Sequence, residues 1–430
     1  MPLCEIPGSV SSYWLVGFDK DGDELKDPSA GTHTFLSARI LSEIRDHRPT
    51  DIFLSSHGWK GDLPGAKAQY DRWFGAMLAR QDDLRAMGTD FRPLWIGLHW
   101  PSLPFGEETF GTTSFSAEHP SQEEILEKYI EFFDNGSQDI RQLLGTIFRE
   151  HQKNAGAVQM PEYVARAYQE LSQLIGYESG GLDAPPDSDG VDFDPVAAFE
   201  VSEELGDDFA ESAVLSGLLS PLRQLSFWTM KKRARRLGEN AMHAFCRALQ
   251  GECPAVRIHL IGHSFGCIVV SSILGGPGGT ARLARPVESV VLIQGAVSLW
   301  AFADFIEVVA KPGYFNSMLR GPAVCGPIVI TRSKHDGAVG TLYPLAVGIA
   351  LQVAFDGQRL PIFGGIGTWG MQGVREAEDI VMLPASEPYA FRSGGIYNLE
   401  STEYVGGHSA IDGPEVAHAI WEAVRTGAGK

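Results

Sequence analysis

One serine in this sequence stands in a setting that suits nucleophilic chemistry. Ser264 is the central residue of Gly262-His263-Ser264-Phe265-Gly266, which fits the pattern G-x-S-x-G. The apolar run RIHLI precedes the pattern and the apolar run CIVVSSIL follows it, as expected for a strand, a sharp turn and a helix. The flanking glycines leave room for a strained backbone at such a turn. This context favours a nucleophilic Ser264 over a serine that only caps the helix.

A nucleophilic serine needs a general base, and the base needs a carboxylate that orients it. Among the 12 histidines, His408 is the best base, because it lies in a glycine-rich loop between the last strand pattern and the last helix pattern. Three other histidines are weaker choices. His263 directly precedes the serine and would point away from it, His335 adjoins the predicted acid, and His418 lies inside the final helix pattern.

Asp336 is the predicted acid. It ends the run PIVITRSKHD, so it follows an apolar strand pattern and precedes a glycine. In open α/β sheets, sites form at the carboxyl ends of the strands. Asp304 and Asp412 are the weaker alternatives for this role, and a plain turn aspartate is the structural alternative for Asp336.

Alternating strands and helices must position these residues. Apolar runs predict strands at 11–19, 50–62, 92–102, 255–263, 288–297, 326–336 and, more weakly, 394–402. Helix patterns lie at 34–47, 64–88, 227–251 and 414–424. Strands that are apolar throughout and alternate with helices indicate an α/β protein with a parallel sheet covered on both faces.

A long segment, 106–224, interrupts this alternation. It carries helix patterns at 121–135 and 160–177 and no convincing strand. We therefore expect a core made of 1–105 and 225–430, with 106–224 as a largely helical insertion between strands 4 and 5. Such an insertion could fold over the site as a cap or lid.

Three further stretches have a structural and a functional interpretation. The acidic run within 179–195 is expected to be a solvated loop rather than a calcium site, since it lacks EF-hand spacing. The basic cluster at 231–236 is expected to be the solvated face of a helix rather than an anion or partner site. The apolar, glycine-rich stretch 342–373 is expected to be a buried helix and a tight loop rather than the wall of an acyl pocket.

The chain resembles the α/β-hydrolase superfamily, in its serine esterase and lipase-like form. The motifs that carry the resemblance are GHSFG, SKHD, GGHS and the early HGW, and Ser264, Asp336 and His408 follow one another in the superfamily's order. The resemblance covers about residues 11–105 and 225–430. It implies an eight-stranded, mostly parallel sheet with helices on both faces and a Ser-His-Asp triad on loops at its C-terminal edge.

The resemblance also implies an oxyanion hole. Its two backbone N–H donors would be those of Phe265, directly after the serine, and Trp59, in the loop after HG. His57 lies two residues before Trp59, and His263 lies two residues before Phe265. These two histidines are the predicted substrate-binding residues.

The function that these features predict is hydrolysis of a carboxylic ester in a small-molecule acyl substrate, through an acyl-enzyme on Ser264. An amidase, peptidase, thioesterase or acyltransferase would use the same three residues. A non-catalytic, hydrolase-like binding module is the alternative of a different class. The chemistry requires no metal and no organic cofactor, and the oligomeric state stays open.

Net charge and cysteine usage bound the partners and the compartment. The 430 residues carry 35 basic and 54 acidic side chains, a formal net charge of -19, which disfavours nucleic acid and anionic membranes as partners. We find no signal peptide and no transmembrane segment. The five scattered cysteines suggest a reduced, cytoplasmic setting, and a mature secreted form is the alternative.

Overall fold

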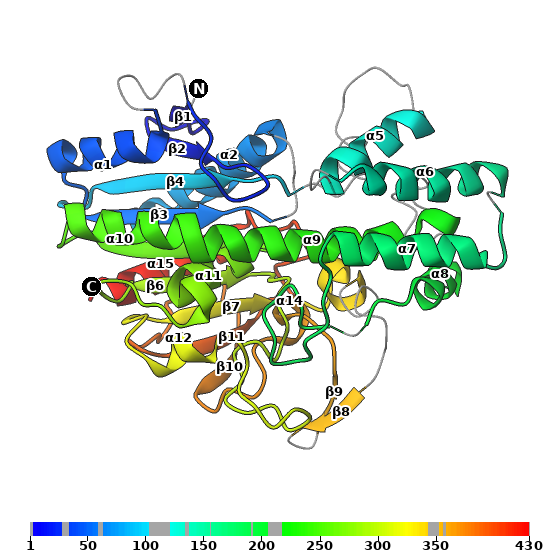
Figure 1. Ribbon diagram of the computed structural model, residues 1–430. Coiled ribbons are helices and arrows are strands. Elements are labelled where there is room, and N and C mark those ends of the chain that lie inside the picture. Colours follow the sequence, from blue (N-terminus) through cyan, green and yellow to red (C-terminus); the bar gives the residue numbers. More distant parts are fainter. Residues whose placement is uncertain are drawn as a thin grey trace.

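The computed structural model describes residues 3–27, 34–58, 63–102, 121–133, 137–154, 156–190, 192–204, 217–342, 352–355 and 358–429. Within these ranges, nine strands form one sheet in the order β1-β2-β4-β3-β5-β6-β7-β11-β10 (Figure 1). The strands are β1 (Leu3–Glu5), β2 (Ser12–Gly17), β3 (Asp51–Ser56), β4 (Pro93–His99), β5 (Arg257–His263), β6 (Ser289–Ile293), β7 (Ile328–Arg332), β10 (Ala377–Val381) and β11 (Ile396–Glu400). Only the β1–β2 pair is antiparallel. The expected α/β class with a mostly parallel sheet is confirmed.

The sheet has nine described strands where eight were expected. The seven strands that the sequence predicts are all present, and the unpredicted ones are the edge strands β1 and β10. β1 has only three residues, and every residue of β10 is at least partly exposed. Neither strand therefore carries the continuous apolar run that marks a strand covered on both faces.

The central strands are buried on both faces, and β3 and β5 carry the buried polar residues Asp51 and His259 beside their apolar ones. In β3 all six residues are buried, and successive side chains point to opposite faces. Ile52 and Leu54 join one hydrophobic core, whereas Phe53 joins the core on the other face of the sheet. The same alternation in β5 sends Leu260 to the first core and Ile261 to the second.

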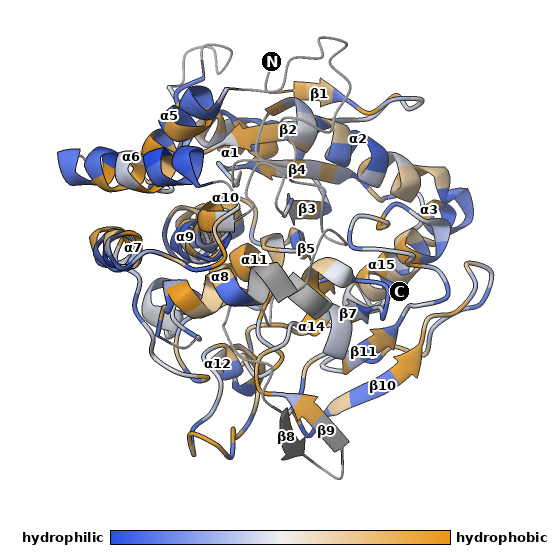
Figure 2. Ribbon diagram, turned by 90° about the vertical axis from the view of Figure 1, so that its right-hand side faces the viewer, coloured by the Kyte–Doolittle hydropathy of each residue, from blue (hydrophilic) through white to orange (hydrophobic). Residues whose placement is uncertain are grey.

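Helices cover both faces of the sheet (Figure 2). The first face is covered by α1 (Leu36–His47), α9 (Pro221–Leu237), α10 (His243–Glu252), α11 (Gly266–Gly275) and α12 (Asn316–Arg320). The second is covered by α2 (Leu63–Ala79), α3 (Gln81–Ala86) and α15 (Pro414–Gly427). The single helix expected at 64–88 is thus two helices that break at Arg80. No helix in the described part of the chain is both long enough and apolar enough to cross a membrane.

A helical segment separates β4 from β5, as expected. It contains α5 (Gln122–Phe133), α6 (Gln138–Lys153), α7 (Glu162–Leu174) and α8 (Pro195–Glu204), and Figure 1 shows these helices beyond the end of the sheet toward which the parallel strands run. The expected boundary at 224/225 falls inside α9, which continues through a short π-helical stretch (Gly238–Met242) into α10. The role of the segment as a cap or lid stays a prediction.

The acidic stretch 179–195 and the basic cluster on α9 are not the two solvated surfaces that the sequence predicted. Lys231 is fully buried and its Nζ lies 2.5 Å from Asp189 Oδ1. Arg235 pairs with Asp187, also at 2.5 Å between nitrogen and oxygen, and both side chains are largely buried. A buried charge is tolerated when an opposite charge and hydrogen bonds accompany it. The acidic stretch therefore packs on the basic helix.

The stretch 342–373 differs in part from the expected buried helix and tight loop. Residues 343–351 lie outside the described residues. Strands β8 (Gln352–Phe355) and β9 (Gln358–Pro361) then form an antiparallel pair, so the helix prediction is wrong there. A short helix, α14 (Ile366–Trp369), follows and has a buried first turn. The alternative role as the wall of an acyl pocket stays a prediction.

Candidate functional site

The parallel strands β3 and β5 lie side by side near the centre of the sheet, and the order in which the chain adds strands changes direction between them. β3 is followed by α2 and then by β4 on one side, while β5 is followed by α11 and then by β6 on the other side. Because α2 and α11 lie on opposite faces, neither helix covers the carboxyl ends of the two strands. Such a switch point is where open α/β sheets form binding crevices. The residues that follow β3 and β5 there are His57-Gly58 and Ser264.

Ser264 adopts a strained backbone at the turn between β5 and α11. Its φ is +56°, in the left-handed region that costs a residue other than glycine about 1–3 kcal/mol. Backbone bonds hold the strain: Ser264 N–H donates to the Ile293 carbonyl at 3.1 Å, and the Ser264 carbonyl accepts from the N–H of Cys267 and of Ala296. The hydroxyl thereby stands at the carboxyl end of a central strand, as the sequence predicted.

Two glycines let neighbouring chain segments approach this turn. A Cβ on Gly266 would lie 2.2 Å from the Ser56 carbonyl oxygen, so only glycine lets α11 start so close to β3. A Cβ on Gly58 would lie 2.3 Å from Ser264 Cβ and 2.9 Å from its Oγ. The HG pair after β3 therefore contacts the serine directly.

The structure brings together the three residues that the sequence singled out as nucleophile, base and acid. His408 Nε2 lies 2.8 Å from Ser264 Oγ, and His408 Nδ1 lies 3.0 Å from each carboxylate oxygen of Asp336. The three residues follow β5, β11 and β7, and β7 and β11 are neighbours in the sheet. Ser264 and Asp336 are each only 1% exposed, whereas the His408 side chain is 20% exposed. We call this arrangement the Ser264 relay.

The weaker candidates for base and acid do not belong to the Ser264 relay. Asp304 pairs with Arg320 and Arg375, and Asp412 pairs with Arg72. His335 is exposed. His418 lies on α15, next to Asp83.

The carboxylate of Asp336 is held by donors on both of its oxygens. The Val339 N–H donates to Oδ1 at 2.9 Å, and the side-chain amide of Gln294 donates to Oδ2 at 3.1 Å. Gln294 follows β6 and is fully buried. Its contact with Asp336 could not be predicted from the sequence, because nothing in the stretch ESVVLIQGAV distinguishes a glutamine that faces a carboxylate 42 residues later in the chain.

His263 contacts the loop that carries His408. Its Nε2 donates to the His408 carbonyl at 2.9 Å, and its Nδ1 lies 3.0 Å from Gln69 Nε2, a donor on α2. A carbonyl can only accept and an amide nitrogen can only donate, so the ring carries its proton on Nε2. Both nitrogens therefore have partners within the chain. The predicted role of His263 in substrate binding stays a prediction. The contacts that His263 makes join α2 to the loop that carries His408.

His57 is also buried among protein groups. Its Nδ1 lies 2.7 Å from the Gly58 carbonyl, its ring stacks on Trp100 with centroids 5.7 Å apart, and its backbone N–H donates to Tyr70 Oη. The Tyr70 hydroxyl also bonds to the backbone of Ser55 and Leu98, so it ties the ends of β3 and β4 together. Burial raises the pKa of Tyr70 well above its ordinary value. Substrate binding by His57 stays a prediction.

Of the two predicted oxyanion donors, one lies within the described residues. Phe265 directly follows Ser264 at the start of α11, and its buried ring packs edge-to-face on Phe227 of α9, with centroids 5.2 Å apart. This contact anchors the residue whose N–H would face the oxyanion. Trp59 lies outside the described residues.

A second hydrogen-bonded group of Ser, His and Asp lies at the opposite end of the strands, and we call it the buried relay. His259 Nδ1 lies 2.8 Å from Ser289 Oγ, and His259 Nε2 lies 3.1 Å from Asp51 Oδ1. Burial acts to raise the pKa of Asp51, but hydrogen bonds from His259, Arg257 and Thr50 outweigh it, so the pKa lies below its ordinary value. All three members of this buried relay are at most 1% exposed and belong to regular strands. Proximity of the three residue types therefore does not by itself make a reactive site.

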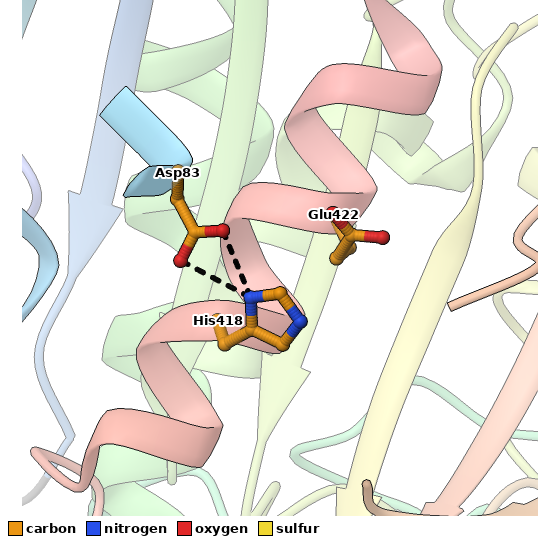
Figure 3. Close-up of side chains that lie close together, drawn as sticks. All are labelled: Asp83, His418 and Glu422. Atoms are coloured by element: carbon orange, nitrogen blue, oxygen red, sulfur yellow. Dashed lines mark hydrogen bonds and ion pairs between the residues drawn. The ribbon is translucent and has the colours of Figure 1, made fainter. Parts of the chain in front are cut away.

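One cluster of side chains in the described ranges has the composition of a metal site. Asp83 of α3 and His418 and Glu422 of α15 have ligand atoms within 4.8 Å of one another (Figure 3). Their polar atoms already have partners. His418 bonds through Nδ1 to the Asp83 carboxylate and through Nε2 to the Glu387 carbonyl. The two carboxylates also pair with Arg80 and Arg425, and these guanidinium groups would repel a divalent cation. The cluster suits an ion-pair network that joins α3 to α15.

A hollow of about 510 Å³ lies in the helical segment, between α7 and the acidic stretch that follows it. Its lining is polar or acidic apart from Tyr177 and Phe193, and it includes Gln169, Ser172, Glu178 and Asp192. No member of the Ser264 relay lines it. It is thus separate from the site at the sheet edge.

Comparison with known proteins found no family model, no curated protein and no solved structure that matches this chain.

Proposed function

We propose that this chain is a serine hydrolase of the α/β-hydrolase type that cleaves a carboxylic ester through an acyl-enzyme on Ser264. The observation that carries the proposal is the hydrogen-bond series from Ser264 Oγ through both nitrogens of His408 to Asp336. The α/β class alone would not support it, because that class hosts many unrelated functions.

Comparison with the buried relay strengthens the proposal. In the buried relay the serine bonds to Nδ1 and the aspartate to Nε2, inside regular strands that substrate cannot reach. In the Ser264 relay the serine stands on a left-handed turn at a topological switch point, and the histidine is partly exposed. Strain retained at a strand-to-helix turn is typical of functional sites.

The first half of the proposed reaction forms the acyl-enzyme. Ser264 Oγ attacks the carbonyl carbon of the ester while its proton moves to His408 Nε2, which gives a tetrahedral oxyanion and an imidazolium. Asp336 holds the ring through Nδ1 and stabilises its positive charge. His408 then returns the proton to the alkoxide oxygen, the C–O bond breaks, and the alcohol leaves.

The second half releases the acid. Water attacks the acyl-enzyme carbonyl, and His408 Nε2 takes one of its protons. The tetrahedral intermediate collapses, and the proton passes to Ser264 Oγ as the bond to the acyl group breaks. In both halves the N–H of Phe265 would stabilise the oxyanion, together with that of Trp59. Loss of one such donor typically costs about 3 kcal/mol of transition-state stabilisation.

Ester cleavage makes a smaller demand on the relay than amide cleavage does. An alcohol is a better leaving group than an amine, so general-acid catalysis has less to supply. Amide, thioester and acyl-transfer chemistry would use the same atoms. We propose a small-molecule acyl substrate, with no metal and no organic cofactor in the reaction.

A panel of p-nitrophenyl esters of increasing chain length tests the proposal. We expect turnover by the wild-type protein and a loss of at least about 1,000-fold in kcat for Ser264→Ala. Ser289→Ala is the matched control, because it removes the serine of the buried relay; it should retain activity in proportion to the folded fraction. Equal turnover by wild type and Ser264→Ala would refute the proposal. A folded protein that reacts with a fluorophosphonate but cleaves no ester would point to amide, thioester or acyl-transfer chemistry.

A further inference from the structure

Gln294 has an unusual backbone for a buried glutamine. It directly follows β6, is fully buried, and has a φ of +45°. Left-handed residues other than glycine are uncommon, and they persist where the surrounding structure holds them. The neighbouring residue is Gly295, yet the left-handed conformation falls on the glutamine. We therefore expect contacts of the Gln294 side chain to hold the residue in this conformation.

Hydrogen bonds fix the orientation of the Gln294 amide. Its backbone N–H donates to Thr331 Oγ1 at 3.1 Å, and the Thr331 hydroxyl donates to Gln294 Oε1 at 2.9 Å. The amide nitrogen must then face the other way, where it donates to Asp336 Oδ2 at 3.1 Å and to the Gly367 carbonyl at 3.3 Å. An amide turned by 180° would direct its oxygen at a carboxylate, so the network itself decides the assignment.

A glycine of α14 covers the contact between amide and carboxylate. A Cβ on Gly367 would lie 2.6 Å from the backbone carbon of Gln294 and 2.9 Å from Asp336 Oδ2. Any larger residue would push the two groups apart. The segments after β6 and β7 and the helix α14 thus pack closely around the Asp336 carboxylate.

We infer that Gln294 is a positioning residue that fixes the plane of the Asp336 carboxylate so that both of its oxygens face His408 Nδ1. This inference rests on the proposed function. The Val339 N–H holds Oδ1 and the Gln294 amide holds Oδ2. Two donors on two different oxygens define the rotation of the carboxylate about its Cβ–Cγ bond. Without Gln294, Oδ2 is free to rotate away, and His408 loses part of what orients its ring.

A purely structural role for Gln294 is the competing explanation, since its contacts with Thr331 also join the ends of β6 and β7. The two roles differ in what they change. Loss of orientation at His408 lowers kcat and leaves KM nearly unchanged, because Gln294 is buried behind Asp336 and does not reach substrate. Loss of a strand contact lowers stability and leaves kcat per folded molecule unchanged.

The test compares Gln294→Ala with Gln250→Ala, using a p-nitrophenyl ester. Gln250 is a matched control: it is 3% exposed, and its amide bridges to the backbone of Arg285 on both sides, away from the loops of the Ser264 relay. We expect Gln294→Ala to lower kcat on the order of 10- to 100-fold with KM changed less than about 2-fold, and Gln250→Ala to change kcat less than about 2-fold.

The near-isosteric variant Gln294→Glu adds a second measurement, the pH dependence of kcat/KM, which a purely structural role of Gln294 would not change. This measurement also tests the inference if Gln294→Ala does not fold. Two adjacent carboxyl groups share a proton at lower pH, which restores a donor to Asp336, and both ionise as the pH rises. We expect the ratio of kcat/KM, variant to wild type, to fall with rising pH. A ratio that is flat across the pH range would overturn the inference.

Fluorophosphonate labelling separates this inference from the proposed function. If the folded wild-type protein is not labelled, the proposed function fails and the inference fails with it. If the wild type is labelled, and Gln294→Ala is labelled at the same rate with wild-type kcat, the positioning role alone is overturned.

Discussion

His263 Nε2 donates a hydrogen bond to the backbone carbonyl of His408 at 2.9 Å. The residue before the proposed nucleophile thus holds the loop of the proposed base. Because Gln69 on α2 engages the other nitrogen of His263, this support extends from the second face of the sheet to the site.

Replacement of His263 by leucine should therefore lower kcat by about 10-fold while KM changes little, because the base is displaced and no substrate contact is lost. Steady-state kinetics of three variants check this: His263→Leu, Gln69→Leu and the double variant that combines the two substitutions. The two substitutions should be less than additive, since they break one connected series. A rise in KM at unchanged kcat would instead show that His263 binds substrate.

Gly58→Ala should lower kcat by about 100-fold. The added methyl group would lie 2.3 Å from Ser264 Cβ, so the serine or the loop after β3 must move. A shift of about 1 Å at a reacting group can cost about 100-fold in rate. The measurement is kcat on a p-nitrophenyl ester.

Gly75→Ala is the control for that substitution. Gly75 lies within α2, and its added Cβ would meet nothing within 4 Å. We expect full activity and a gain of about 0.5–1 kcal/mol in the free energy of unfolding, because alanine is the better helix former. Equal activity in the two alanine variants would contradict the close packing at Ser264.

The buried relay should contribute to acid sensitivity. The folded-state pKa of Asp51 is depressed, so its stabilising effect is complete above the unfolded-state pKa of about 3.9 and is lost as the pH falls below it. The stability advantage of wild type over Asp51→Asn, measured by urea unfolding, should shrink by about 1 kcal/mol between pH 7 and pH 3. An advantage that stays constant or grows on acidification would show that the pKa of Asp51 is not depressed.

His418→Ala should lower stability without changing the chemistry of the folded protein. It leaves the buried Asp83 carboxylate without its histidine partner, which typically costs about 1–3 kcal/mol. Thermal unfolding and kcat per folded molecule check this. A Zn²⁺-dependent rise in the Tm of the wild type that is absent from His418→Ala would contradict the ion-pair network and indicate a metal site instead.

The sequence was most informative where a local pattern determines a position in the fold. Apolar runs located the seven inner strands, because burial on both faces makes apolar residues frequent in them. The ends of those runs then located Ser264, Asp336 and His408, since parallel strands bring their carboxyl ends to one edge.

What the sequence could not predict depends on contacts between distant segments. Lys231 and Asp189 each looked solvated, because each charge was considered without a partner 42 residues away. The supports of the site, Gln294 and Gln69, are single polar residues within otherwise ordinary patterns. Their roles appear only when the strands and helices are assembled. The edge strand β10 was missed because partial exposure removes the apolar run.

The most direct test of the proposed mechanism is the site of covalent labelling by a fluorophosphonate, mapped by mass spectrometry of the digested protein. The proposed mechanism predicts one adduct, on Ser264, which disappears in Ser264→Ala, is strongly reduced in His408→Ala and persists in Ser289→Ala. A folded wild-type protein without an adduct, or an adduct that persists in Ser264→Ala, would contradict it.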